Sequence, residues 1–227
     1  MIPRPVDPLV AALDVSTVEE AERLAALLAP FVGMLKVGLE LLWAEGPGAV
    51  GRVAAHGPVF VDCKLHDIPT TVERAAANVA RLGPAMLNVH ALGGEAMMRA
   101  ARSGADRGAE QAGLDRPLVV AVTVLSSQAG EGLASPASLA FEAKAAGLDG
   151  VVVSGDDVDD VRATCGEGFC LVVPGIRPPG SNGHDQVRVL TPAEAIEKGA
   201  DYLVIGRPLT GAADPAGVAR SILRDIR

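Results

Sequence analysis

The stretch that decides the fold reads VFVDCKLHDIPTTVERAAANVARL and extends from Val59 to Leu82. It begins with a short apolar run, Val59–Asp62, and after a polar connection it continues with an Ala-rich segment of helical periodicity, Thr71–Leu82. An apolar run followed by such a segment predicts one strand and one helix of a parallel sheet.

The same alternation continues along the whole chain. Further strands are predicted at Leu9–Leu13, Met34–Val37, Met86–Val89, Leu118–Val124, Gly150–Val153, Cys170–Val173 and Tyr202–Ile205. Further helices are predicted at Val18–Leu28, Glu95–Gln111, Ser138–Ala146, Pro192–Lys198 and Pro215–Ile226. Thr17 predicts the start of the first helix as its N-cap, and Gly147 and Gly199 predict the ends of two others.

These repeats predict an α/β protein with a single (β/α)8 barrel, in which residues 1–227 form one catalytic domain. Strands that are apolar throughout are covered on both faces, and eight strand and helix units close most simply into such a TIM barrel. A doubly wound open sheet is the alternative. It has less support, because no Gly-rich dinucleotide fingerprint follows the first strand.

Composition excludes several classes of function. The chain of 227 residues has 20 Lys and Arg against 28 Asp and Glu, a net charge of −8, and without a basic block it is a poor candidate for a nucleic-acid binder. No apolar stretch approaches the roughly 18–20 residues of a membrane span. Three Cys without a CxxC pair and four scattered His predict neither a disulfide framework nor a metal site. The start, Met1–Pro5, lacks the features of a signal peptide, so we expect a cytoplasmic protein.

Polar residues recur at the carboxyl ends of the predicted strands, where barrels of this kind carry their active sites. They are Asp14, Lys36, Asp62, Lys64, His90, Thr123 and Arg207. Any one of them alone could cap a helix or face water. Their repetition on six strands favours a functional site.

The densest group follows the third predicted strand. Asp62 and Lys64 are two residues apart at the strand end, so both side chains should project the same way and meet above the barrel. Asp67 follows beyond the extended part, and Pro69 disfavours a helical conformation at Ile68. A lysine held between carboxylates stays charged and fixed, which suits a proton donor to a carbanion. A structural ion pair that closes the barrel mouth is the alternative.

A second polar region follows the seventh predicted strand. The Gly- and Pro-rich connection Val173–Gln186 is longer than usual and is typical of a lid, with Arg177 and Gln186 near its ends. Gly206 and Arg207 follow the eighth strand. Barrels often bind phosphate at the loops after strands seven and eight, through backbone N–H groups and a bidentate Arg. For Arg177 an exposed loop cation is the alternative.

The chain closely resembles the orotidine 5′-phosphate decarboxylase family of the bacterial type. The resemblance covers nearly the whole sequence, and its most specific element is the Asp-x-Lys-x-x-Asp-Ile-Pro-x-Thr string from Asp62 to Thr71. The other matching segments occur in the family's order: Ala12–Asp14, Leu35–Gly38, Asn88–Ala91, Val122–Ser127, Pro174–Arg177 and Ile205–Pro208.

The resemblance implies decarboxylation of orotidine 5′-phosphate to UMP without any cofactor or metal. Lys64 would protonate the C6 carbanion, within an alternating charged array of Lys36, Asp62, Lys64 and Asp67. It also implies a homodimer with shared sites, in which Asp67 and Thr71 reach the partner's site. The residues that would bind the substrate are Asp14, Lys36, Asp62, Thr71, Ser126, Arg177, Gln186, Gly206 and Arg207. Ser126 stands where close relatives have Thr, and either hydroxyl can bind the base.

Two other functions compete with this one. Sugar-phosphate enzymes on the same barrel, such as 3-keto-gulonate-phosphate decarboxylase or hexulose-phosphate synthase, share the Asp-x-Lys-x-x-Asp core but use Mg²⁺ and a carboxylate on the second strand, where this chain has Lys36. A catalytically silent barrel that senses a nucleotide would keep Gly206 and Arg207 but would be free to lose Lys64 and its acids.

Overall fold

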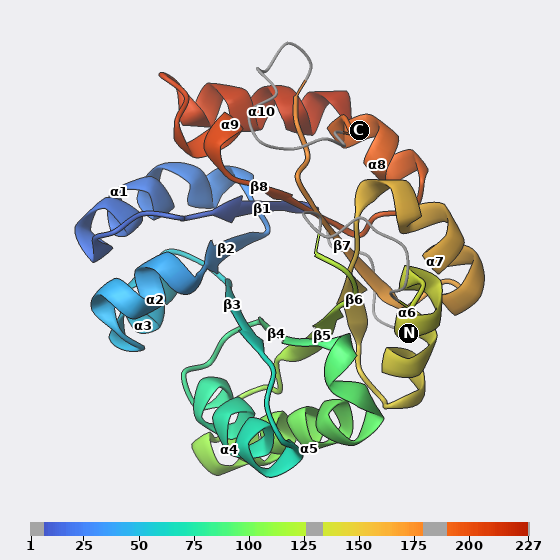
Figure 1. Cartoon of the computed structure of the whole chain (residues 1–227). Helices are drawn as coiled ribbons and strands as arrows, with labels where there is room; N and C mark the ends of the chain where they lie inside the picture. The colour runs from blue at the N-terminus through green and yellow to red at the C-terminus, as the bar shows by residue number, and fades with distance from the viewer. Residues whose placement is uncertain (1–6, 126–133, 179–189, 227) are drawn as a thin grey trace.

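In the computed structural model, which describes residues 7–125, 134–178 and 190–226, parallel strands form one closed barrel (Figure 1). Each strand pairs with the next one in sequence, and β8 pairs with β1. The strands are β1 Leu9–Ala12, β2 Met34–Val37, β3 Val59–Leu65, β4 Met86–His90, β5 Leu118–Val122, β6 Gly150–Val152, β7 Cys170–Pro174 and β8 Tyr202–Ile205. The predicted (β/α)8 barrel is therefore confirmed.

Helices surround the barrel on its outer side (Figure 1). They are α1 Val18–Leu28, α2 Leu39–Glu45, α3 Gly48–Ala54, α4 Pro69–Ala80, α5 Gly94–Ala112, α6 Pro136–Ala145, α7 Val158–Cys165, α8 Pro192–Glu197, α9 Arg207–Thr210 and α10 Pro215–Asp225, with short 3₁₀ turns at Ala29–Phe31, Ala91–Gly93 and Gly155–Asp157. Within the described ranges no helix is both long enough and apolar enough to cross a membrane.

Several predicted boundaries were wrong. The strand predicted to end at Asp62 continues as β3 to Leu65, and the helix predicted to begin at Thr71 begins at Pro69. Proline fits the first helical position because it lacks an N–H, and a backbone N–H at that position would have no partner within the helix. The prediction did not include α2, α3, α7 and α9, which have at most eight residues each and show little periodicity. The equally short α8 was predicted, and it begins with a proline and is followed by Gly199.

The predicted helix caps are present. Thr17 accepts a hydrogen bond from the backbone N–H of Glu20 at 3.4 Å and so caps α1. Gly147 and Gly199 follow α6 and α8 with φ of +83° and +104°, a backbone conformation that glycine adopts without steric cost.

Helices α4 and α5 lie unusually close together. A Cβ atom on Gly104 or Gly108 of α5 would lie 2.1 or 2.2 Å from the carbonyl oxygens of Glu73 and Ala77 on α4. The two glycines therefore allow backbone contact between the helices. This contact fixes α4, which carries Thr71 and directly follows the segment with Asp67.

Candidate active site

The inside of the barrel is filled in layers, because alternate strand residues point inward. One buried inner layer consists of apolar side chains, among them Val10, Met34, Phe60 and Met86. Two residues further along β2, β3 and β4, toward the carboxyl ends, the inward positions belong to Lys36, Asp62 and Asn88. The same alternation that builds the core thus places a polar layer on top of it.

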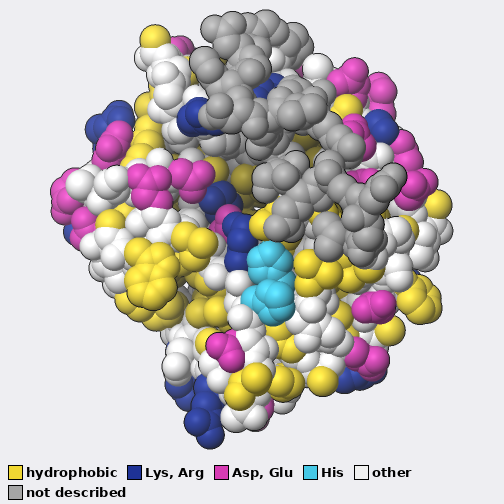
Figure 2. Space-filling view, in the orientation of Figure 1, with side chains coloured by type: hydrophobic (Ala, Val, Ile, Leu, Met, Phe, Trp, Pro, Cys, Tyr) yellow, Lys and Arg dark blue, Asp and Glu magenta, His cyan; other side chains and the backbone are white. Residues whose placement is uncertain are grey.

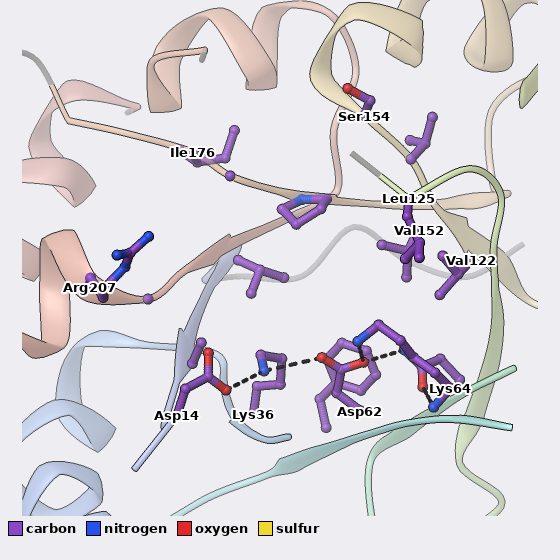
Figure 3. Close-up of a pocket in the computed structure, with 18 of the residues that line it drawn as sticks. Asp14, Lys36, Asp62, Lys64, Val122, Leu125, Val152, Ser154, Ile176 and Arg207 are labelled. Atoms are coloured by element: carbon purple, nitrogen blue, oxygen red, sulfur yellow. Dashed lines mark hydrogen bonds and ion pairs between the residues drawn. The ribbon is translucent and has the colours of Figure 1, made fainter. Parts of the chain in front are cut away.

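A row of alternating charges lies at this edge of the barrel (Figure 3). The Lys36 ammonium is 2.9 Å from the Asp14 carboxylate and 3.1 Å from Oδ2 of Asp62. The other oxygen of Asp62, Oδ1, is 2.5 Å from Nζ of Lys64. The structure thus brings Asp62 and Lys64 together, as the spacing predicted, and adds Asp14 and Lys36 to the same row.

Burial alone would neutralise these groups, but their neighbours keep them charged. Burial opposes ionisation of Asp62, yet Lys36 and Lys64 outweigh it and hold the pKa of that carboxyl below its usual range. Burial likewise opposes the charge on Lys36, and the nearby Asp62 and Asp14 raise its pKa above the usual value. Asp62 and Lys36 therefore stay ionised at neutral pH.

The backbone at Lys64 is not that of a regular strand. Lys64 has φ of +47° and is the only non-glycine residue with positive φ among those described. Val61 pairs with Leu87 and Leu65 with Val89, so that three residues of β3 stand opposite one residue of β4. The contact between Asp62 and Lys64 is thus produced by a bulge in β3. The left-handed backbone conformation of a non-glycine residue costs about 1–2 kcal/mol of conformational free energy.

The sequence analysis assigned no role to two residues next to this row. Asn88, 1% exposed, contacts both the Asp62 side chain and the Lys64 backbone. The sequence feature that could have revealed Asn88 is its polar amide within the otherwise apolar predicted strand Met86–Val89. Gly38 was noted only as part of a matching segment. A Cβ atom there would lie 2.8 Å from the Asp14 carboxylate and 2.9 Å from the Lys36 ammonium, so the glycine leaves the space that this ion pair occupies.

The charged row forms one side of a cavity of about 330 Å³ at the carboxyl ends of the strands. Its opposite side is largely apolar, with Val122, Val124, Leu125, Val152, Pro174, Ile176 and Val204, and the hydroxyl of Ser154 also lines it. Arg177, Gly206 and Arg207 line the cavity after β7 and β8, and Figure 3 shows Arg207 and Lys64 at opposite ends of the view. The cavity therefore offers a cation at each end and an apolar surface between them.

Four expected site residues are not seen in this cavity. Asp67 and Thr71 are exposed and do not line it, and the Asp67 carboxylate accepts a hydrogen bond from the N–H of Ile68 at 2.6 Å. Ser126 and Gln186 lie outside the described residues, as does most of the predicted lid.

Two histidines lie beside the row. The rings of His66 and His90 are 5.3 Å apart, and Figure 2 shows histidine side chains next to Lys or Arg atoms at the centre of this face. Burial, together with His66 and Lys64, lowers the pKa of His90, which is therefore neutral at pH 7. Among the described residues, no three His, Cys, Asp or Glu side chains form a cluster that could hold a metal ion.

Fold and site together define a (β/α)8 barrel with a row of paired carboxylates and lysines at its catalytic edge. The model of the "Orotidine 5'-phosphate decarboxylase / HUMPS family" matches residues 7–222. The chain belongs to this family.

Known proteins support this assignment over the full length. The chain is 50% identical to the orotidine 5′-phosphate decarboxylase of Anaeromyxobacter dehalogenans, over 96% of this chain and 98% of that protein. It is 46% identical to the enzyme of the same name from Moorella thermoacetica, over 97% of this chain and 92% of that protein. The crystal structure of orotidine 5′-phosphate decarboxylase from Lactobacillus acidophilus superposes with a TM-score of 0.84 at 34% identity, covering 97% and 99% of the two chains. The predicted family is confirmed.

Proposed function

We propose that this chain decarboxylates orotidine 5′-phosphate to UMP and CO2, without cofactor or metal, and that Lys64 supplies the proton. The observation that carries the proposal is the position of the Lys64 ammonium, 2.5 Å from Asp62 at the end of a charged row that lines the cavity. The relatives with this name match over nearly the whole chain.

The chemistry needs positive charge where negative charge develops. When the bond between C6 and the carboxyl group breaks, its electron pair remains on C6 and CO2 leaves. Lys64 stabilises that charge and transfers an N–H proton to C6, and the resulting neutral amine takes up a proton from water. Asp62 keeps Lys64 in place, while Lys36 balances the second oxygen of Asp62.

The remaining side chains have binding roles in this proposal. Asp14 and Lys36 hold the ribose hydroxyls, and Ser126 faces the pyrimidine. Arg177, Gln186, Gly206 and Arg207 take the phosphate. Arg177, Gly206 and Arg207 all line the cavity, and Arg207 lies at the end away from Lys64. This supports the assignment, because a substrate with a phosphate at one end and a reacting carbon at the other needs a cation near each. Phosphate binding far from C6 can then contribute to the rate of the chemical step.

The activity and its metal independence are tested in one experiment. Purified protein is incubated with orotidine 5′-phosphate in excess EDTA, and UMP and CO2 are quantified. We expect full turnover. Activity that is lost in EDTA and restored by Mg²⁺ would favour a sugar-phosphate enzyme, which places a carboxylate where this chain has Lys36. Binding of the nucleotide without turnover would favour a sensor.

We further propose a homodimer in which Asp67 and Thr71 complete the partner's site. Both residues are exposed and lie off the cavity of their own chain. Large apolar side chains are exposed on the segments that follow the neighbouring strands β2, β3 and β4: Leu39, Trp43, Ile68 and Leu92. Trp43 is 85% and Ile68 66% exposed, and Figure 2 shows hydrophobic side chains gathered over the α2 region beside the cavity. Such a patch next to Asp67 favours a contact between subunits.

Subunit mixing tests the shared site. Lys64→Ala and Asp67→Ala chains are each expected to be inactive, and they are mixed until exchange is verified by mass. In a mixed dimer one site then has both defects and the other has none. Random exchange makes half of the dimers mixed, so activity should return to about a quarter of wild type. A verified mixture without activity would place Lys64 and Asp67 of one chain in the same site.

A further inference from the structure

The most constrained part of the site is the bulge that carries Lys64. Asp62, Cys63 and Lys64 of β3 stand opposite Asn88 alone, so the regular backbone pairing between β3 and β4 stops there and resumes at Leu65. A backbone N–H that leaves a ladder inside a protein needs another acceptor. The structure supplies one from the side chain of the residue on the facing strand.

Asn88 makes two side-chain hydrogen bonds across this bulge. Its Oδ1 accepts from the backbone N–H of Lys64 at 2.7 Å. Its Nδ2 donates to Oδ1 of Asp62, also at 2.7 Å, and this is the same oxygen that contacts the Lys64 ammonium. The amide thus joins the backbone of Lys64 to the carboxylate that holds the Lys64 side chain.

The backbone of Asn88 also contributes. Its carbonyl oxygen accepts a hydrogen bond from the Cys63 thiol at 3.6 Å, so all three bulged residues are tied to this one position. At 1% exposure, Asn88 has no water to replace these bonds if they are lost. A left-handed conformation at a lysine persists only where its surroundings impose it, and here the amide of Asn88 is the group that does so.

We propose that Asn88 is the positioning residue for the proton donor: its amide holds Lys64 in the left-handed conformation that directs the ammonium at the cavity and fixes the acceptor oxygen of Asp62. This inference rests on the proposed role of Lys64. Asn88 acts through Lys64 and Asp62, so its loss should slow the chemical step far more than it weakens substrate binding.

Two substitutions at this position separate the two hydrogen bonds. Asn88→Ala removes both, and we expect kcat to fall by about 30-fold or more while KM changes by less than about threefold. Asn88→Asp keeps the shape and the acceptor for the Lys64 N–H but places a second carboxylate against Asp62. Like charges in contact raise the pKa of one of the pair, so this variant donates to Asp62 only when protonated. Its kcat should therefore rise as the pH is lowered from about 8 to about 5, whereas that of wild type should not.

Asp149→Ala is the matched control. Asp149 is 9% exposed, directly precedes β6 at the amino ends of the strands, and its carboxylate accepts a hydrogen bond from the backbone N–H of Val119 at 2.8 Å. Its loss removes a buried hydrogen bond between a side chain and the backbone of a neighbouring strand without touching Lys64. We expect kcat within about twofold of wild type, while thermal unfolding reports the cost to stability of each variant.

The outcomes are decisive. Asn88→Ala with kcat within about threefold of wild type, or Asn88→Asp with the pH profile of wild type, would overturn the inference. If Asn88→Ala does not fold by circular dichroism, the pH profile of the isosteric Asn88→Asp decides alone. An active Lys64→Ala would instead count against the proposed function, whereas an active Asn88→Ala beside an inactive Lys64→Ala counts against this inference only.

Discussion

The two sides of the cavity are built in different ways. On the side of β1 to β4, each polar group is fixed by neighbours within 3.1 Å: Asp14, Lys36, Asp62, Lys64 and Asn88. On the side of β5 to β8 the wall is largely apolar, and the cations Arg177 and Arg207 also line the cavity. Under the proposed function, the first side holds the proton donor and the groups that fix it, together with Asp14 and Lys36 for the ribose, whereas the second side carries the phosphate contacts.

The strongest test of this division is Lys64→Ala. We expect kcat to fall by at least about 10³-fold while the protein stays folded, because the other ammonium of the row, Lys36, is held between Asp14 and Asp62. Lys198→Ala is the control. Lys198 forms one ion pair with Asp159 at 2.6 Å on the surface, and its loss should leave activity unchanged. A Lys64→Ala variant with more than about a tenth of wild-type activity, a barrier change under ~1.4 kcal/mol, would remove Lys64 from its role.

The binding side should respond differently. Arg207→Ala removes a cation from the end of the cavity assigned to phosphate. A hydrogen bond to a charged group contributes about 1.5–3 kcal/mol. We therefore expect kcat/KM to fall by roughly 10- to 100-fold, mainly because KM rises. Arg23→Ala serves as the control, because Arg23 is exposed and lies 4.0 Å from Glu20. A loss confined to kcat, with KM unchanged, would show that the two sides do not divide binding from chemistry in this way.

The sequence predicted the charged side better than the binding side, for physical reasons. Asp62 and Lys64 were found because regular strand alternation would give two residues at this spacing a shared direction, although in the structure a bulge brings them together instead. The left-handed backbone at Lys64 has no counterpart in the sequence, because it follows from a register shift between β3 and β4. Asn88 was overlooked inside an apolar strand, where its amide signals a buried polar partner rather than solvent.

The binding side depends on long connections rather than on strands. Ser126 and Gln186 lie in segments outside the described residues, so their roles stay predictions. Arg177 and Arg207 could be placed because each follows a strand closely. The fold itself was predictable from repeated apolar runs, whereas the short helices α2, α3, α7 and α9 have too few turns to show a period.

A smaller effect is expected from Gly38, which tests how tightly the charged side is packed. In Gly38→Ala the new methyl group would lie 2.8 Å from the Asp14 carboxylate and must displace it or Lys36. The backbone of Gly38, with φ of −97°, is open to alanine, so folding should be little affected. We expect kcat/KM to fall by about tenfold. Gly51→Ala is the control, since nothing lies within 4 Å of its added Cβ. Equal activity of the two variants would mean that the Asp14 and Lys36 pair tolerates displacement.

The smallest effect concerns the pH dependence of stability, in which the two sides should differ in kind. The folded-state pKa of Asp62 lies below its unfolded value, so its contribution to stability is present above about pH 4 and is lost as the pH falls through the folded pKa. Lys36→Met removes a charge that lowers this pKa. The variant should therefore be less stable than wild type at pH 7, and the difference between them should shrink as the pH falls toward about 3.

Val204→Ala provides the comparison from the apolar side. Val204 is 8% exposed in the barrel interior and carries no charge. Its truncation should therefore lower the free energy of unfolding by about 1–3 kcal/mol, and by the same amount at both pH values. The measurement is the free energy of unfolding in urea at pH 7 and at about pH 3. For Lys36→Met we expect the difference from wild type to narrow between pH 7 and about pH 3, because protonation of Asp62 removes the charge that Lys36 stabilises. Suppose instead that the difference in free energy of unfolding between Lys36→Met and wild type were the same at both pH values, as expected for Val204→Ala. Lys36 would then not be the group that keeps Asp62 ionised, and the charged side would owe its stability to packing, as the apolar side does.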